Sequence, residues 1–289
     1  MKQFKRQFSL LLFLFLMGLS LLFAWHEQQA VEGNVLVHVI DVGQADCMVL
    51  ETPHGNVLVD SGADVSEGQL RAYLKSHGLN HFAYMILSHP HDDHIGNADM
   101  LLREFQVDRV LCAETSSAET VWTLFVTELD NLKTAGKTEW IKAETGTVCH
   151  LGALRIEVLF APKPDNEGEN NDSLLVRMDY GDCSMLLTGD AEANAEEMFL
   201  NEVSSEKLQA DFLKVGHHGS SGSTTDAFLT VVSPKIATIS AGTGNSFGHP
   251  HEEVLARLRE RNVEIYRTDN SGTLVFVCDG TSFSRRKLF

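Results

Sequence analysis

Three histidines and two aspartates fall within six positions of the segment SHPHDDHIGN, residues 88–97. His89, His91, Asp93 and His94 form an H-x-H-x-D-H quartet directly after the apolar run AYMIL. Imidazole and carboxylate groups ligate zinc, and also manganese or iron. His89 and His91 can point to one metal ion, and Asp93 and His94 can reach a second ion nearby. A polar surface loop is the alternative, but ligands spaced in this way at a strand end favour a metal site.

The chain that carries the quartet has 289 residues, of which 43% are hydrophobic, and a net charge of −17. This length allows one large domain or two small ones, and the hydrophobic content fits a sizeable core. The negative charge disfavours tight, non-specific binding of nucleic acid, which depends on cations that neutralise phosphates. It leaves open a nucleic-acid substrate that is held locally by metal ions.

The N-terminal residues differ in character from the rest of the chain. Lys2, Lys5 and Arg6 precede an apolar run over residues 8–25 that only serine and glycine interrupt. A basic region before an apolar run is typical of export signals, and this run is about long enough to span a bilayer. We therefore expect residues 1–30 to be a signal anchor or signal peptide with a short link. The body would lie outside the cytoplasm, anchored in the membrane or secreted after cleavage; a buried core helix is the alternative.

Strand and helix patterns alternate along residues 31–289. The runs VLVHVIDV, CMVLET and NVLVDSG predict strands, and a helix is expected from residue 66 to 77. The strand AYMILSH ends at the quartet, and further helices are expected near residues 98–105 and 118–134. Strands are expected over 139–160, and a hairpin turns at residues 180–182 before helices and strands alternate again. This order predicts two mixed sheets packed face to face with helices outside.

The five cysteines are widely scattered, and none forms a C-x-x-C pair. Because their number is odd, at least one is free or pairs with another chain. We expect most of them to be small core residues on strands, and we predict no disulfide.

The quartet resembles the metal-binding motif of the metallo-β-lactamase superfamily. VDSGA (59–63) is similar to the early Asp-x-Gly turn of that family, and LLTGD (186–190) is similar to the strand that ends in its bridging aspartate. The resemblance implies an α/β fold, the αββα four-layer sandwich of two mixed β-sheets, over residues 31–289, with the metals at one edge of the sheets. It also implies that Asp190 bridges the two metals, since a carboxylate offers two oxygens.

A closer resemblance is to the extracellular hydrolase domain of competence proteins of the ComEC type. It covers nearly everything after residue 30. IDVGQADCMVLETPHGNVLVDSG is similar to the opening of that subfamily, and ADFLKVGHHGSSGSTTDAFL and SFGHPHEEVLARL are similar to its two later signatures. The resemblance is specific because several motifs occur in the same order.

The chain departs from the superfamily in one ligand. Many members have a third histidine between the quartet and the bridging aspartate, whereas the corresponding loop here reads ENNDSLL. One of His217 and His218, at the end of a strand that should adjoin the site, is expected to fill the vacancy. The other would act as general acid or hold a substrate oxygen. We take His217 as the ligand and His218 as the catalytic residue, with the reverse assignment open; weaker alternatives for the vacancy are Asn170, Asn171 and Asp172.

The resemblance assigns the last ligand to His249, in the GHP segment after a later strand. His249 would join Asp93 and His94 around the second metal, while His251 is expected to open a helix. We interpret Asp41, Gln44 and Asp46 as structural hydrogen-bonding residues beneath the site.

These assignments predict a metal-dependent hydrolase, most simply a phosphodiesterase or nuclease. Two divalent ions, zinc or alternatively manganese, would activate a water, with catalytic roles for Asp93, Asp190 and His218. The resemblance implies a phosphate-ester substrate, DNA in particular. There are two alternatives. One is a cell-surface phosphoesterase that acts on wall-polymer substituents such as phosphorylcholine, and the other is a non-catalytic, metal-stabilised binding module. β-Lactam hydrolysis is disfavoured by the missing third histidine.

Overall fold

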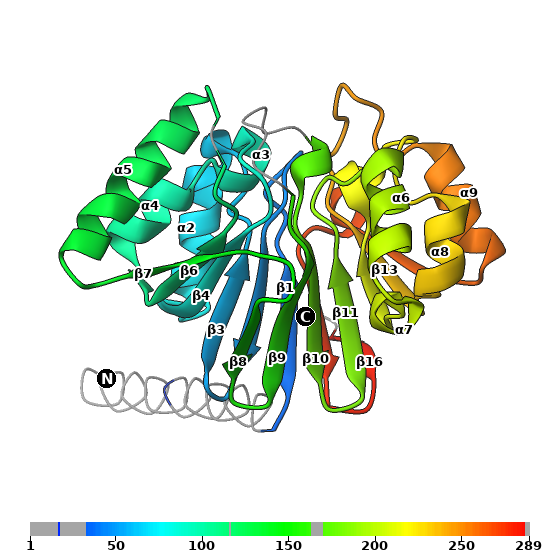
Figure 1. The fold of residues 1–289 in the computed structure, drawn as a ribbon, viewed down its shortest axis with the longest axis horizontal. Helices are drawn as coiled ribbons and strands as arrows, with labels where there is room; N and C mark the ends of the chain where they lie inside the picture. The colour runs from blue at the N-terminus through cyan, green and yellow to red at the C-terminus, as the bar shows by residue number, and fades with distance from the viewer. Residues whose placement is uncertain (1–16, 18–32, 116, 163–169, 287–289) are drawn as a thin grey trace, which may run out of the picture.

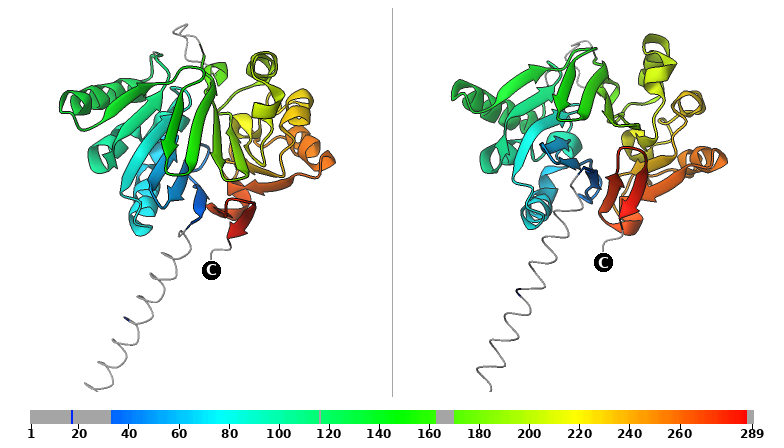
Figure 2. Two further views of the ribbon diagram at one scale, coloured as in Figure 1. Left: turned by 60° about the horizontal axis from the view of Figure 1, so that its bottom comes forward. Right: turned by 90° about the horizontal axis from the view of Figure 1, so that it is seen from below.

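Two β-sheets pack face to face, and helices cover the outer face of each sheet (Figures 1 and 2). The structure is a computed structural model and describes residues 17, 33–115, 117–162 and 170–286. Within this part of the chain the architecture is the αββα four-layer sandwich of two mixed sheets, so the predicted fold class is confirmed.

The predicted signal anchor lies outside the described residues, except for Met17. Among the residues that the structure does describe, no helix combines the length and the apolar character needed to cross a bilayer.

The first sheet joins the N-terminal strands to the last strands of the chain. In the described residues it has nine strands in the order β16-β15-β1-β2-β3-β4-β6-β7, with β5 beside β4. Strands β16 to β3 pair antiparallel, whereas β3, β4, β6 and β7 run parallel. Their bounds are β1 (Val35–Val39), β2 (Met48–Thr52), β3 (Gly55–Val59), β4 (His81–Leu87), β5 (Gln106–Val107), β6 (Arg109–Cys112), β7 (Glu139–Lys142), β15 (Leu274–Cys278) and β16 (Phe283–Arg286).

The second sheet changes from antiparallel to parallel pairing in its middle. Its seven strands in the described chain follow the order β14-β13-β12-β11-β10-β9-β8. Strands β8 to β11 pair antiparallel, and β11 to β14 run parallel. Their bounds are β8 (Val148–Leu151), β9 (Leu154–Phe160), β10 (Leu175–Tyr180), β11 (Cys183–Leu187), β12 (Phe212–Lys214), β13 (Ile236–Ile239) and β14 (Glu264–Arg267).

Each sheet carries its own helical layer (Figure 1). The helices on the first sheet are η1 (Asp64–Ser66), α2 (Glu67–Ser76), α3 (Asp92–Ile95), α4 (Ala98–Glu104) and α5 (Thr120–Thr134). Those on the second are α6 (Ala193–Glu202), α7 (Ser205–Leu208), α8 (Asp226–Val232) and α9 (Glu252–Glu260). Short helical turns within the loops are η2 (Asn170–Asp172), η3 (Gly216–Gly219) and α10 (Thr268–Ser271).

Three apolar clusters hold the four layers together, one between the sheets and one under each helical layer. The period of two along a strand sends neighbouring residues to different clusters. In β12, Phe212 packs between the sheets and Leu213 packs under the second helical layer. In β1, Val37 faces the other sheet, while His38 turns outward to the hydroxyl of Tyr73 on α2. Each fully buried aliphatic or aromatic side chain contributes roughly 1.5–3 kcal/mol to stability.

The predicted helices lie within one or two residues of their observed bounds, whereas the strands predicted as VLVHVIDV and NVLVDSG end three residues earlier than expected. The helices expected at 66–77, 98–105 and 118–134 are α2, α4 and α5. The predicted hairpin turn at 180–182 joins β10 to β11. The short α7 and α10 and the edge strand β16 were not predicted, because their exposed, polar sequences carry no clear hydrophobic period.

All five cysteines are free thiols, and all are buried. Most were expected to be core residues, and, as predicted, none forms a disulfide. Burial raises the pKa of the Cys112 thiol to about 12, so this side chain stays neutral at physiological pH.

Gly96, in the quartet segment, is a position where the fold leaves no space for a side chain. A Cβ atom there would lie 2.5 Å from the carbonyl oxygen of Asp92 and 2.7 Å from the carbonyl carbon of Ala63. We expect Gly96→Ala to lower the free energy of unfolding by about 1–3 kcal/mol, because backbone rather than a flexible side chain must move. Gly68→Ala on α2, where nothing lies within 4 Å, should instead raise it by roughly 0.4–1 kcal/mol. Urea denaturation of both variants tests this, and equal effects would contradict it.

Candidate metal centre

Four strands of the two sheets deliver the predicted site residues to one edge of the sandwich. The quartet follows β4, Asp190 follows β11, and His217 and His218 follow β12. The loop after β13 carries His249. Because β11, β12 and β13 run parallel, their carboxyl ends meet at the same edge of the second sheet.

A compact group of four residues lies at the centre of this edge. Asp46, His94, Asp190 and His218 each offer one ligand atom, and these atoms all lie within 4.8 Å of one another. All four side chains are buried. The Nε2 atom of His94 is 3.1 Å from Oδ1 of Asp190, and Nε2 of His218 is 3.2 Å from Oδ2 of Asp93.

Asp60 fixes the orientation of His94. Its Oδ2 atom lies 2.8 Å from Nδ1 of His94 and also accepts a hydrogen bond from the hydroxyl of Ser88, while Oδ1 accepts from the backbone N–H of Ser88. An Nδ1–H that donates to a carboxylate turns Nε2 into the free ligand atom of a histidine. The Nε2 lone pair of His94 therefore faces the carboxylate of Asp190.

Facing lone pairs of this kind require a cation between them. Nε2 of His89, Nε2 of His94 and Oδ1 of Asp190 are buried and have no hydrogen-bond partner in the described chain. Burying such atoms without a partner is costly, and a proton or a metal ion removes the cost. Histidine nitrogens and carboxylate oxygens are donors that divalent zinc, manganese and iron accept. The residues present therefore fit a divalent metal.

The quartet histidines gather on one side of the compact group. The ring of His89 is 4.1 Å from that of His94 and 4.6 Å from that of His91, measured between centroids. Burial, followed by the charge of His94, lowers the pKa of His89 well below its usual value. A neutral imidazole is the form that binds metal.

His217 and His218 stand side by side in a strained turn. Their φ angles are 44° and 52°, in the left-handed region that residues other than glycine rarely adopt. His218 is buried, and its Nδ1 donates to the carbonyl of Ser240. His217 is partly exposed; its Nδ1 lies 2.9 Å from Oε1 of Glu192, and its Nε2 lies 3.7 Å from Oδ2 of Asp190. The strained turn thus directs both rings to Asp190.

His249 closes the group from the loop after β13. Its ring centroid is 5.4 Å from that of His217 and 6.4 Å from that of His218. Gln44 reaches its Nδ1 at 3.4 Å and accepts a hydrogen bond from the backbone of Gly242, so Gln44 has the hydrogen-bonding role expected of it. Burial and the neighbouring histidines lower the pKa of His249 to about 4.

The loop that lacks the third histidine places other groups near the site. The amide of Asn170 lies 3.4 Å from Nε2 of His217, and the hydroxyl of Ser173 lies 3.3 Å from Nδ1 of His89. Asn171 points elsewhere, since its side-chain oxygen accepts from the backbone of Glu192 near the start of α6. Of the weaker candidates for the vacancy, Asn171 therefore does not face the site.

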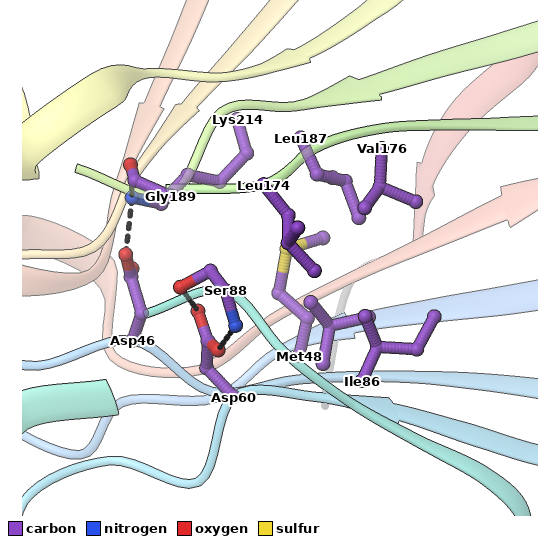
Figure 3. Close-up of a pocket in the computed structure, with 11 residues that line it drawn as sticks. Asp46, Met48, Asp60, Ile86, Ser88, Leu174, Val176, Leu187, Gly189 and Lys214 are labelled. Atoms are coloured by element: carbon purple, nitrogen blue, oxygen red, sulfur yellow. Dashed lines mark hydrogen bonds and ion pairs between the residues drawn. The ribbon is translucent and has the colours of Figure 1, made fainter. Parts of the chain in front are cut away.

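Lys214, a buried cation at the floor of the site, was not singled out in the sequence. Its ammonium group forms an ion pair with Asp46, donates to the carbonyl of Gly189 and lies 4.0 Å from Oδ1 of Asp190. Lys214, Asp46 and Gly189 line the polar end of a cavity of about 20 Å³ (Figure 3). A charged residue inside a predicted strand, between Leu213 and Val215, was the signal that could have revealed it.

Two buried histidines and two carboxylates of the site shift one another's pKa values toward the charged forms. Burial opposes the charge on His94 and His218, but the carboxylate of Asp190, with Asp60 or Asp46, outweighs burial and raises both histidine pKa values. Burial likewise opposes ionisation of Asp190 and Asp93, but these histidines hold the pKa of both carboxyls below its usual value. The carboxylates thus favour positive charge at the two histidines, which is the charge that a divalent ion would bring to the same space.

Comparisons with known proteins show which sequences and folds this chain is similar to. A family model described as the metallo-beta-lactamase superfamily matches residues 40–243. ComE operon protein 3 of Bacillus subtilis is 35% identical over 263 residues, which are 83% of this chain and 32% of that protein. Recombination protein 2 of Haemophilus influenzae is 30% identical over 242 residues, which are 82% of this chain and 28% of that protein. The chain spans about a third of the length of these curated relatives.

Solved structures share the fold at low sequence identity. YhfI of Bacillus subtilis, a metallo-beta-lactamase fold protein, matches with a TM-score of 0.57 and 16% identity, covering 85% of this chain and all of that chain. A metallo hydrolase from Ignicoccus hospitalis matches with a TM-score of 0.57 and 16% identity, covering 83% and 98%. These two likenesses establish the fold alone.

The role of Asp60 predicts an effect on metal affinity. Asp60→Asn removes the carboxylate that fixes His94, so we expect the affinity for zinc to fall by roughly 10–100-fold. Asp64→Asn, a change of the same type at an exposed position, is the control and should leave affinity unchanged. Competition with a chromogenic chelator measures both variants. Equal affinity of Asp60→Asn and the parent would contradict the role given to Asp60.

The buried ion pair of Lys214 predicts an effect on stability. Lys214→Met leaves Asp46 buried without the cation that it pairs with, so the metal-free protein should lose about 3–5 kcal/mol of unfolding free energy. Lys235→Met removes an exposed lysine that pairs with Asp211, and it should change little. Urea denaturation of both variants without metal makes the comparison; similar small losses would show that Lys214 is not needed to balance the carboxylates.

Proposed function

The chain belongs to the metallo-β-lactamase superfamily, and from that membership we propose that it is an extracytoplasmic, metal-dependent phosphodiesterase that cleaves nucleic acid. The observation that carries the proposal is the buried group of Asp46, His94, Asp190 and His218, whose ligand atoms lie within 4.8 Å of one another. Divalent ions held there supply an activated water and positive charge that stabilises a phosphoryl transition state.

The proposed ligands form two sets, one for each metal ion, with Asp190 between them. His89 and His91 would hold one ion, Asp93, His94 and His249 would hold the other, and Asp190 would serve both. Asp60 keeps the Nε2 lone pair of His94 directed at this space.

For the histidine pair we propose the reverse of the assignment made from the sequence. His218 is buried, and both of its ring nitrogens have partners in Ser240 and Asp93, which suits a group that completes the metal centre. The side chain of His217 is 23% exposed, and Glu192 holds its Nδ1. A histidine oriented by a carboxylate, with its other nitrogen at the open face, can give a proton to a leaving oxygen. His217 is therefore the proposed general acid.

The proposed substrate is supported by the relatives. One is named Recombination protein 2, and another is a competence protein of Neisseria gonorrhoeae that is 27% identical over 267 residues. We take the words recombination and competence in these two names as support for a nucleic-acid substrate. Zinc is the first candidate for the metal and manganese the second, since histidine and carboxylate ligands suit both. The predicted signal anchor supports a location outside the cytoplasm.

The proposal predicts activity that needs both metal and Asp190. The full chain should hydrolyse bis(p-nitrophenyl) phosphate and linear DNA after zinc or manganese is added, and not after chelation. Asp190→Asn should lose more than about 100-fold in kcat/KM, because even residues that only support a metal ligand cost roughly 10–100-fold. Asp182→Asn, at an exposed turn, is the matched control and should keep full activity.

Two results would overturn the proposal in different ways. Hydrolysis that survives removal of all metal would exclude metal-dependent catalysis. About two bound metals per chain without hydrolysis of any phosphodiester would exclude this reaction. That result would favour either another ester class, such as phosphorylcholine esters, or a metal-stabilised binding module.

A further inference from the structure

One exposed aromatic side chain lies beside the metal centre. Phe247 is 64% exposed, and no other Phe, Tyr or Trp side chain among the described residues is as open to solvent. It belongs to the loop between β13 and α9, the orange segment at the top edge in Figure 1, which is also the edge that carries α3. Its ring lies 5.7 Å from the ring of His249, and the two rings are tilted by 28°.

The loop around Phe247 is held by a hydrogen-bond network that centres on Asn245. The side-chain oxygen of Asn245 accepts from the backbone N–H groups of Phe247 and His249 at 3.2 and 3.0 Å. Its side-chain nitrogen donates to the carbonyls of Gly242 and His249 at 2.9 and 2.6 Å. One side chain therefore fixes Phe247 and the proposed ligand His249 relative to each other. The exposure of Phe247 is built into an ordered loop.

The charge of the chain limits how it can bind a polyanion. The net charge is −17, and tight binding through phosphates requires cations that neutralise them. Lys214, which reaches the site carboxylates, is buried and already paired with Asp46. Metal ions and contacts with the uncharged part of each nucleotide are therefore the sources of affinity that this net charge does not oppose. Stacking of a base on an aromatic ring is a contact of this kind, and it works for any base sequence.

We infer that Phe247 is the platform on which a base of a single-stranded nucleic-acid substrate stacks while the adjacent phosphate sits at the metal centre. This inference rests on the phosphodiesterase function proposed above. It assigns Phe247 to substrate recognition and His249, fixed in the same loop, to the metal. The arrangement favours substrates with unpaired bases, because a base inside a duplex cannot present its face to a ring.

The test compares a short single-stranded oligonucleotide with the same strand carrying abasic residues. In the full-length, metal-loaded protein, Phe247→Ala should lower kcat/KM on the normal strand by about 5- to 100-fold, mainly through KM. It should leave kcat/KM on the abasic strand and the metal content unchanged. Phe247→Trp should keep the preference for the normal strand, and Leu124→Ala, at another exposed apolar position, should have no effect.

Two results would overturn the inference. Equal losses on both strands would mean that Phe247 only supports the loop of His249, and no loss on either strand would mean that it contacts no base. In the second case, a loss on p-nitrophenylphosphorylcholine alone would assign the ring to a quaternary ammonium group, which aromatic faces also bind.

Failure of the proposed function gives a different result. The parent protein would then cleave neither strand although it holds metal. Fluorescence anisotropy of the labelled strands measures binding without turnover, so it still tests the contribution of Phe247. Unchanged binding in Phe247→Ala would overturn the inference in that case as well.

Discussion

The contact between the lone pair of His94 and the carboxylate of Asp190, 3.1 Å apart and buried, is the constraint on which the rest of the site depends. Two electron-rich atoms out of water cannot remain this close without a cation between them. Asp60 fixes the ring of His94 by accepting a hydrogen bond from its Nδ1. The ammonium group of Lys214, 4.0 Å from Oδ1 of Asp190, offsets part of the negative charge of that carboxylate. The protein therefore maintains a position that only a proton or a metal ion can fill, which is the property required of a metallohydrolase.

The two-sheet architecture brings the site residues together and stabilises the strained backbone among them. Strand β4 of the first sheet and strands β11, β12 and β13 of the second end at one edge, so short loops bring residues from four parts of the chain together. Three apolar clusters stabilise the layers beneath. Such a frame can tolerate the left-handed backbone of His217 and His218, each at a cost of about 1–3 kcal/mol. Strain of this size persists only where the surrounding structure fixes the conformation, as it does between Ser240 and Glu192.

The acidic surface outside the site limits how the proposed nucleic-acid substrate could be attracted to it. An acidic chain does not concentrate polyanions by long-range charge, so recognition has to act at short range. Asn245 holds two residues of one loop together by hydrogen bonds: Phe247, which we propose binds a base, and His249, which we propose binds metal. The surface proposed to receive substrate and the groups that would hold metal are consequently fixed together.

The sequence alone determined the fold class, the helix bounds to within two residues, and the residue types at the candidate metal centre, because hydrophobic period and ligand spacing are local properties of the chain. It did not identify Asp60 as the partner of His94, or Lys214 as the buried counter-charge of Asp46. The first contact joins segments 34 residues apart and depends on the pairing of β3 with β4 in one sheet. The second depends on the packing of the two sheets, which brings Asp46 to Lys214. The geometry of His217 and His218 was also decided by tertiary structure. Two adjacent histidines look equivalent in a sequence, and only the turn and its neighbours, Ser240 and Glu192, bury one ring and leave the other partly open to solvent.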